Sequence, residues 1–122
     1  PRLVAVQASA LDPLCRAFEA GLETGPAVEP TASSVAEGLA ISEPVRGKRL
    51  LQAIRDTGGT CVAVPDEATL EAQRRLARRG LYVEPTSATA VAALDTVLKR
   101  AAPEDTIVVP LTGSGLKGSP QI

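Results

Sequence analysis

Histidine, methionine and tryptophan are absent from this sequence of 122 residues, and its aromatic residues are limited to Phe18 and Tyr82. Without histidine, the chain cannot build a Ser-His-Asp triad, a Cys-His pair, an imidazole general base or a His-ligated metal site. Any catalysis by this chain would therefore depend on carboxylates, lysines or a cofactor. Because 44% of the residues are hydrophobic, the core must consist mainly of Ala, Val, Leu and Ile.

A strong charge of either sign is also missing. The 13 lysines and arginines nearly balance the 14 aspartates and glutamates, which leaves a net charge of -1. This balance offers no bulk electrostatic reason to bind nucleic acid or an anionic membrane. No apolar run approaches the ~20 residues of a membrane span, and no pattern typical of a signal peptide is present. We therefore expect a cytoplasmic protein with neither nucleic acid nor a membrane as a partner.

The two cysteines, Cys15 and Cys61, lie in apolar stretches and have neither CxxC spacing nor a histidine partner. This pattern favours buried, reduced thiols in a reducing cytosol. A single disulfide between them is the alternative.

Short apolar runs alternate with segments of helical periodicity along the chain. Strands are predicted at 3–8, 61–64, 81–84 and 106–111, and helices at 12–21, 34–39, 48–57, 66–79 and 86–101. Alternating elements whose strands are apolar on both faces indicate a parallel sheet with helices on both faces, a three-layer sandwich. The predicted fold class is therefore α/β, in a single domain over 1–122.

Ligands of parallel sheets bind beyond the carboxyl ends of the strands, and two such segments carry reactive groups. The segment TGSGLK (112–117) offers small residues for close approach to a flat or anionic ligand, two hydroxyls and a lysine. Its spacing is too short for a Walker sequence, and a terminal loop with flexible glycines is the alternative. In VEPTSA (83–88), the Glu84 carboxylate at a strand end is either exposed on a rim or held for use. We expect Thr86 or Ser87 to cap the helix that follows, as Asp66 would cap the helix before it.

Taken in this order, the segments EPTSA (84–88) and VVPLTGSGLK (108–117) resemble the carboxyl-terminal part of fold-type II pyridoxal-phosphate (PLP) enzymes, most closely threonine synthases. That group often shows an EPSSA-like turn and then a valine-rich strand that ends in TGHGLK. Three further segments agree with the family pattern: LVAVQAS (3–9), SVAEGLAISEP (34–44) and DTGGTCVAVPDEATLEA (56–72). The resemblance thus covers essentially the whole chain.

The resemblance implies roles for particular residues toward the PLP cofactor. Thr112 matches the hydroxyl residue that hydrogen-bonds the pyridine nitrogen, and Glu84 matches a carboxylate near the ring edge. Gly113 and Gly115 would let the loop pass close to the ring. Glu37 would belong to the substrate-side wall formed by 34–39.

Some family features are altered or lie elsewhere. The family's Schiff-base lysine, asparagine loop and glycine-rich phosphate loop all lie upstream of the matched region, and none has a counterpart in this chain. Ser114 stands where threonine synthases commonly have histidine, and Lys117 would fix the loop or meet an anionic group. We therefore expect the chain to be the carboxyl-terminal portion of a larger enzyme, inactive alone and completed by the amino-terminal part.

The implied activity is that of a lyase converting O-phosphohomoserine and water to threonine and phosphate. The nearest alternative is a dehydratase acting on threonine or serine, although such enzymes more often end in an SGGN-like turn, which this sequence lacks. A non-catalytic α/β binding or regulatory module is a further alternative, and a nucleotide-binding domain that uses TGSG is a weaker one. The resemblance also implies a small amino-acid substrate and favours a homodimer.

Overall fold

The computed structural model describes residues 1–117, and its centre is a pair of parallel strands. Strand β1 (Val4–Ala8) pairs with strand β2 (Thr60–Val64) in a register that sets Val4 opposite Thr60. Both strands were predicted from their short apolar runs, and their parallel pairing is confirmed. Because parallel neighbours need a crossover connection, the helices between them must cover the sheet.

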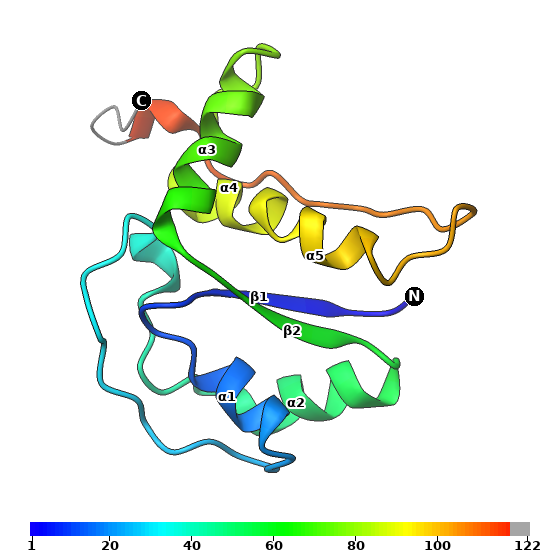
Figure 1. Cartoon of the computed structure of the whole chain (residues 1–122). Coiled ribbons are helices and arrows are strands. Elements are labelled where there is room, and N and C mark those ends of the chain that lie inside the picture. Colours follow the sequence, from blue (N-terminus) through cyan, green and yellow to red (C-terminus); the bar gives the residue numbers. More distant parts are fainter. Residues whose placement is uncertain (118–122) are drawn as a thin grey trace.

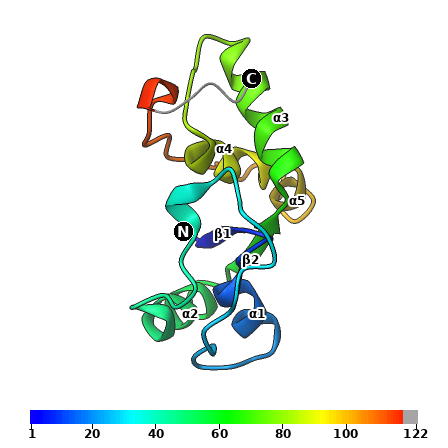
Figure 2. The same cartoon turned by 90° about the vertical axis from the view of Figure 1, so that its left-hand side faces the viewer.

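Helices cover both faces of the strand pair, as Figures 1 and 2 show. On one face lie α1 (Pro13–Glu19) and α2 (Gly47–Asp56). On the other lie α3 (Asp66–Ala77), α4 (Pro85–Ala92) and α5 (Leu94–Leu98). Two short 3-10 helices complete the described elements, η1 (Glu37–Leu39) and η2 (Gly115–Lys117). The three-layer α/β arrangement is therefore confirmed.

Two apolar clusters hold these layers together, one on each face of the strands. The first contains buried residues of α1 and α2, against which Ala5 and Cys61 pack: Leu14, Ala17, Leu51 and Ile54. The second joins β2 to the helices of the other face: Val62, Val64 and Ala93, with Val6 and Val97 packed against them. Successive strand residues thus face opposite layers, as the pleat of a strand requires.

Strands β1 and β2 approach each other closely at Gly59, the residue before β2. The backbone N–H of Thr60 donates to the carbonyl oxygen of Leu3 at 3.2 Å. A Cβ atom at position 59 would overlap with that same carbonyl oxygen. Only glycine therefore lets the chain enter β2 without displacing the start of β1.

Helix α1 begins at a position that the sequence predicts, but its first N–H groups are satisfied in an unexpected way. Proline is the first helical residue, whereas the preceding Asp12 makes no capping hydrogen bond. Instead the side-chain oxygen of Gln7, on β1, accepts from the N–H groups of Leu14 and Cys15 at 2.9 and 3.1 Å. The Gln7 side chain is buried, so it links the strand to the helix inside the core.

Two predicted strands do not form within the part of the chain that the structure describes. Residues 81–84 contribute one isolated antiparallel bridge, between Val83 and Ser114. Residues 106–111 run without regular secondary structure. A β-strand is defined by a hydrogen-bonded neighbour, and no backbone hydrogen bond involving 106–111 occurs among residues 1–117. Their apolar sequence predicted an extended conformation but could not supply a partner.

Two predicted helices also differ from expectation. The segment 34–39 forms only η1, because the Ser34 hydroxyl and the Val35 N–H both donate to the Asp66 carboxylate at the start of α3. The helix expected over 86–101 begins at Pro85 and is interrupted at Ala93. Its hydroxyl at Thr89 donates to the Pro85 carbonyl oxygen at 2.9 Å, a contact that bends helices.

The cysteines are both free thiols, as the sequence predicts, with Cys15 buried and Cys61 partly buried. Hydrogen bonding to the Cys61 thiol and burial raise the pKa of Cys15 well above its ordinary value. The pKa of Cys61 is lowered by the same contact and by the charge of Arg55. The two thiols therefore form an unequal pair between α1 and β2, in which Cys15 stays protonated.

Among residues 1–117, no helix is both long enough and apolar enough to cross a membrane.

Candidate functional site

Four of the predicted site residues lie together where the segment 106–111 ends. Residues 82–84 and 113–115 run antiparallel and exchange two backbone hydrogen bonds: Glu84 N–H donates to the Gly113 carbonyl at 3.0 Å, and Gly115 N–H donates to the Tyr82 carbonyl at 3.0 Å. This pairing brings Glu84 beside the glycines of TGSGLK, next to Thr112. In Figure 1 this site and the carboxyl end of β1 lie on the same side of the molecule, as expected for a parallel α/β sheet.

The Thr112 side chain is exposed, but its hydroxyl contacts a buried residue of α4. It lies 3.3 Å from the hydroxyl of Ser87, which is 4% exposed. The same Ser87 oxygen accepts from the backbone N–H of Gly113 at 2.9 Å. One lone pair of the Ser87 oxygen accepts from the Gly113 N–H, so the Ser87 hydroxyl can donate its own proton to the Thr112 oxygen. The Thr112 hydroxyl proton is then available to a ligand.

Gly113 and Gly115 are close-approach positions. A Cβ atom at 113 would overlap with the side chain of Glu84, and a Cβ at 115 would lie 2.7 Å from the ring of Tyr82. Both glycines are buried. The glycines of TGSGLK therefore serve the packing of 113–115 against 82–84, which is a more specific role than loop flexibility.

Glu84 is the N-cap residue of α4, and its carboxylate lies over Gly113. The side chain is partly buried. A carboxylate at a helix N-terminus is favoured by the helix dipole. Glu84 is therefore held at the site by the helix it precedes and by the glycine it covers.

Glu37 stands on a separate segment, exposed at the start of η1. Its neighbour Gly38 donates its N–H to the hydroxyl of Thr86 at 3.2 Å, which attaches this wall to the first turn of α4. Asp66 attaches the other end through Ser34 and Val35. The structure thus ties the 34–39 wall to the helix that carries Ser87, and it leaves the Glu37 side chain facing outward.

The remaining residues of TGSGLK shape the turn. The Ser114 hydroxyl accepts from the N–H of Leu116 at 3.2 Å, and the Lys117 N–H donates to the Ser114 carbonyl at 3.3 Å. Ser114 and Lys117 are both exposed. Ser114 therefore stabilises the short helix η2 locally, and the exposed Lys117 can reach an anion outside the turn.

For Ser87 and Asp66, the sequence predicts only a role in helix capping. Neither caps a helix: Ser87 serves Thr112 and Gly113, and Asp66 holds the wall segment. A signal was present for Ser87, because Thr86 and Ser87 are adjacent hydroxyls at one helix start. Since one hydroxyl suffices for a cap, the second was available for another contact.

These residues fit the pyridine end of a PLP cofactor. An exposed, neutral hydroxyl on Thr112 can donate to a ring nitrogen, and the Glu84 side chain lies against the same loop at Gly113. Within the described part of the chain, no group of three or more His, Cys, Asp or Glu residues could hold a metal ion. The hydroxyl of Thr112 and the carboxylate of Glu84 therefore suit an organic ring as the ligand.

Comparison with known sequences agrees with this chemistry. Residues 1–113 match the family described as "Pyridoxal-phosphate dependent enzyme". The chain is 37% identical to the threonine synthase of Methanosarcina acetivorans, over 96% of this chain and 29% of the relative. It is 36% identical to the threonine synthase of Methanocaldococcus jannaschii, again over 96% of this chain and 29% of the relative. The chain thus spans less than a third of the curated relatives it matches.

Solved structures show the same fold. A threonine deaminase from T.th. superimposes with a TM-score of 0.68 at 26% identity, covering 96% of this chain and 40% of that one. Threonine synthase from Escherichia coli gives a TM-score of 0.61 at 24% identity, covering 77% of this chain and 22% of that one. The fold is that of fold-type II PLP enzymes. From the family match and the fold, the chain belongs to the pyridoxal-phosphate dependent enzymes, whose cofactor is pyridoxal 5'-phosphate.

Proposed function

We propose that this chain is the carboxyl-terminal part of a threonine synthase-like lyase, which converts O-phosphohomoserine and water to threonine and phosphate. The observation that carries the proposal is the hydroxyl of Thr112, exposed at the end of 106–111 and oriented by Ser87. The two curated threonine synthases at 36 and 37% identity support the choice of reaction.

The cofactor, when bound, supplies the electron sink for elimination and replacement at the substrate's β and γ carbons. Thr112 suits this chemistry because a neutral hydroxyl donates a hydrogen bond to the pyridine nitrogen without holding it protonated, as a carboxylate would. An electron sink that is weaker because its nitrogen is not held protonated favours elimination and replacement. Glu84, which covers Gly113, would lie near the ring edge, against the loop that carries Thr112.

The wall segment 34–39 would border the substrate, and Glu37 is its side chain best able to contact an amino acid. The η1 helix is attached to α4 by the hydrogen bond from Gly38 to Thr86, which places the wall beside the helix that carries Ser87. The Schiff-base lysine would come from the amino-terminal part of the enzyme, so the chain is expected to show no turnover alone. A cytoplasmic homodimer is the assembly that we propose.

A dehydratase acting on threonine or serine is the second candidate. The structural likeness to the threonine deaminase from T.th. supports it. Against it stands the turn TGSGLK, which resembles the threonine synthase pattern and differs from the SGGN-like turn of dehydratases. The two reactions give different products, threonine and phosphate in one case and a 2-oxo acid and ammonia in the other.

The full-length enzyme that contains this chain provides the test. It should release phosphate from O-phosphohomoserine and form threonine. Thr112→Ala should lower kcat by about 10²-fold, the typical loss when one preorganised donor is removed from a reacting system. Thr112→Ser, which keeps the hydroxyl, serves as the matched control and should retain most of the activity. Both variants should fold as the parent does, because Thr112 is exposed.

Two outcomes would contradict the proposal. A Thr112→Ala variant as active as the parent would remove Thr112 from its assigned role. A full-length enzyme that forms a 2-oxo acid and ammonia from threonine, but no threonine from O-phosphohomoserine, would establish the dehydratase.

A further inference from the structure

The wall segment 34–39 has few attachments to the rest of the fold. Within residues 1–117, every hydrogen bond that joins it to another segment ends on the side chain of Asp66 or of Thr86. Its other hydrogen bonds are local and connect residues two or three apart within 34–41. The hydrogen bonds that fix the place of this segment are therefore those of two side chains.

Asp66 makes the more extensive of the two attachments. Its carboxylate oxygens accept separately, one from the Ser34 hydroxyl at 2.7 Å and the other from the Val35 N–H at 2.9 Å. The Ser34 oxygen accepts in turn from the N–H of Ala36 at 3.1 Å, and Ala36 is buried. Hydrogen bonds to an ionised carboxylate are shorter and stronger than those between neutral groups. One carboxylate thus fixes the first three residues of the wall segment.

The position of Asp66 connects this attachment with the ligand-binding edge of the sheet. Asp66 follows the carboxyl end of β2 after a single proline, and parallel sheets bind their ligands beyond the carboxyl ends of their strands. The second attachment, at Thr86, lies next to Ser87, whose hydroxyl is 3.3 Å from that of Thr112. Figures 1 and 2 show the wall segment, in cyan, beside the start of α4. The wall segment is therefore held between the end of β2 and the Thr112 site.

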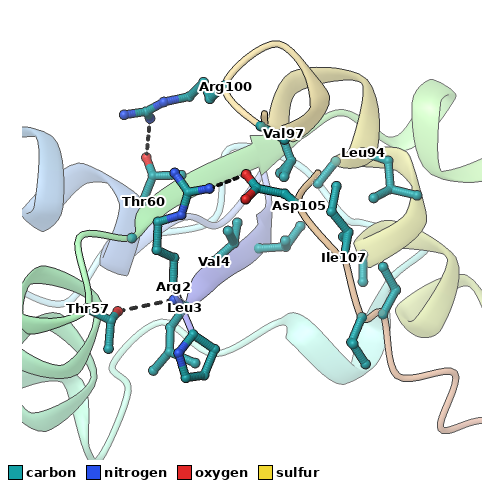
Figure 3. A pocket seen from close by; sticks show the side chains of 18 of the residues that line it. Arg2, Leu3, Val4, Thr57, Thr60, Leu94, Val97, Arg100, Asp105 and Ile107 are labelled. Carbon is teal, nitrogen blue, oxygen red and sulfur yellow. Dashed lines mark hydrogen bonds and ion pairs between the residues drawn. The ribbon is translucent and has the colours of Figure 1, made fainter. Parts of the chain in front are cut away.

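A cavity of about 930 Å³ lies elsewhere, between β1 and the segment 106–110, and neither Asp66 nor the wall segment lines it. Its lining is mostly aliphatic and comes from β1, α4 and α5. Figure 3 shows its charged side chains already paired, Arg2 with Asp105 and Arg100 with Thr60. This cavity offers little polar recognition to a charged amino acid, so the edge that carries Thr112 and the wall segment suits such a substrate better.

We propose that Asp66 is a positioning residue for substrate binding, which holds the wall segment in place beside the Thr112 site through Ser34 and Val35. This inference rests on the proposed function, because the wall segment borders the substrate only in the complete enzyme. Asp66 acts through the wall segment and not on the reacting atoms. Loss of Asp66 should therefore weaken substrate binding and leave the chemical step, which depends on the cofactor and Thr112, nearly unchanged.

Steady-state kinetics of the full-length enzyme tests this assignment. Asp66→Ala should raise KM about tenfold and change kcat by less than about twofold, the pattern expected when substrate and transition state lose the same binding interaction. A KM equal to that of the parent, or a loss confined to kcat, would overturn the proposal.

Substitutions of Ser34 carry the test if Asp66→Ala does not fold. Ser34→Ala removes one of the two donors to Asp66 and should raise KM by a smaller factor than Asp66→Ala. Ser34→Thr keeps the hydroxyl and should restore the KM of the parent. Equal KM values for Ser34→Ala and Ser34→Thr would overturn the proposal.

Two control variants separate this role from general effects of substitution. Glu67 lies beside Asp66 in the first turn of α3, but its side chain is exposed, so Glu67→Ala removes the same charge from the same helix end. Thr60→Ala removes the hydrogen bond to Arg100 at the other end of β2, in the cavity of Figure 3. Both variants should keep the KM of the parent. A rise in KM as large as that of Asp66→Ala in either control would overturn the proposal.

Hydrogen exchange reports the wall segment without turnover. The Val35 amide, which donates to Asp66, should exchange at least about tenfold faster in full-length Asp66→Ala than in the parent, because this opening is local. The Val62 amide in β2 provides the internal reference and should be unchanged. Equal acceleration at Val35 and Val62 would show that the substitution loosens the whole domain, and it would overturn the positioning role.

Failure of this proposal is distinguishable from failure of the proposed function. If the full-length enzyme forms a 2-oxo acid and ammonia from threonine, the lyase reaction is wrong, but the same KM comparison made with threonine still tests Asp66. Threonine formation from O-phosphohomoserine with an unchanged KM in Asp66→Ala would retain the reaction and overturn the positioning role.

Discussion

Two apolar segments of similar sequence, β1 and 106–111, have opposite surroundings. The β1 sequence VAVQA pairs with β2, and its last two residues, Gln7 and Ala8, are buried. The sequence TIVVPL at 106–111 is as apolar, yet Val108 is almost fully exposed and no hydrogen bond within 1–117 pairs its backbone. An apolar run therefore indicates that a segment requires a covered position, while the identity of the covering element comes from elsewhere in the fold.

The two segments also end in different ways. Near the end of β1, the buried Gln7 side chain uses its oxygen to accept two N–H groups of α1. At the end of the other segment, Thr112 exposes its hydroxyl and is oriented by the buried Ser87. The first polar group is committed to holding the fold, and the second remains available to a ligand. Substitutions at three positions test this contrast.

The largest effect is expected at the junction of the two strands. Gly59→Ala places a Cβ against the Leu3 carbonyl oxygen. This is a backbone atom, so no side-chain rotation can relieve the overlap. We expect a loss of about 3 kcal/mol in the free energy of unfolding, as for other overpacked positions. Urea unfolding of the full-length enzyme, followed by circular dichroism, measures it.

Gly47→Ala is the matched control for this substitution. Its nearest neighbour is the Pro44 Cβ, 3.8 Å from the added methyl group, and its position begins α2. The expected change lies within about 0.5 kcal/mol. If Gly59→Ala were as stable as Gly47→Ala, the start of β1 would not depend on its contact with β2.

A smaller loss of stability is expected at the polar end of β1. Gln7→Leu keeps the approximate size of the side chain but removes the acceptor for Leu14 and Cys15, so that two buried N–H groups lose their partner. The expected cost is about 2 kcal/mol, with no change in kcat for the enzyme that remains folded. Thermal unfolding and an activity assay below the transition measure the two quantities.

Gln7→Glu tests whether the acceptor itself is responsible. A carboxylate oxygen at this position still accepts from both N–H groups, and a negative charge is favoured at a helix N-terminus. Gln7→Glu should therefore be more stable than Gln7→Leu. Equal losses for the two variants would show that packing, and not hydrogen bonding, makes Gln7 important.

The smallest of these effects is expected in catalysis, at the residue that supports Thr112. Ser87→Ala removes the hydroxyl that lies 3.3 Å from the Thr112 hydroxyl, and we expect kcat to fall about tenfold in the full-length enzyme, since an imprecisely held donor loses part of its effect. In the Thr112→Ala background the same substitution should cost little more, because coupled residues are not additive. Steady-state kinetics of the four proteins measures the coupling.

Thr86→Ala is the control for this coupling. Thr86 lies next to Ser87 on α4, but its hydroxyl accepts from Gly38 and serves the wall segment. Its effect on kcat should therefore be the same with and without Thr112→Ala. Coupling of equal size at Thr86 and Ser87 would mean that both residues act only through the stability of α4.

Some elements of the fold were predictable because their signals are local. Helix α2 lies within one residue of the predicted 48–57, since leucine and isoleucine recur on one face and a pair of glycines ends it. Helix α3 begins at Asp66, the residue predicted as its N-cap, and ends two residues before the predicted Arg79. Strand β2 extends the predicted strand by one residue, Thr60. Periodicity and breaking residues determine these boundaries at short range.

The residues assigned to the site from the sequence lie together in the structure, but their contacts were not predictable. Glu84, Thr112, Gly113 and Gly115 follow from the motif resemblance, and the structure brings them together. The hydrogen bonds of Ser87 and Asp66 were not predictable, because their partners lie 25 to 32 residues away along the chain. A hydroxyl or carboxylate at a helix start has the same local signal whether it caps that helix or reaches another segment.

The class of the fold, the parallel direction of β1 and β2, and the chemistry available at Thr112 can all be derived from the linear sequence. These properties depend on the order of apolar runs, on helical period and on the presence of a neutral hydroxyl. Three others required the folded chain: Gln7 anchors α1, Ser87 supports Thr112, and 106–110 faces an aliphatic cleft. Each of these joins separate elements of the fold, and its energy depends on positions that only the folded backbone defines.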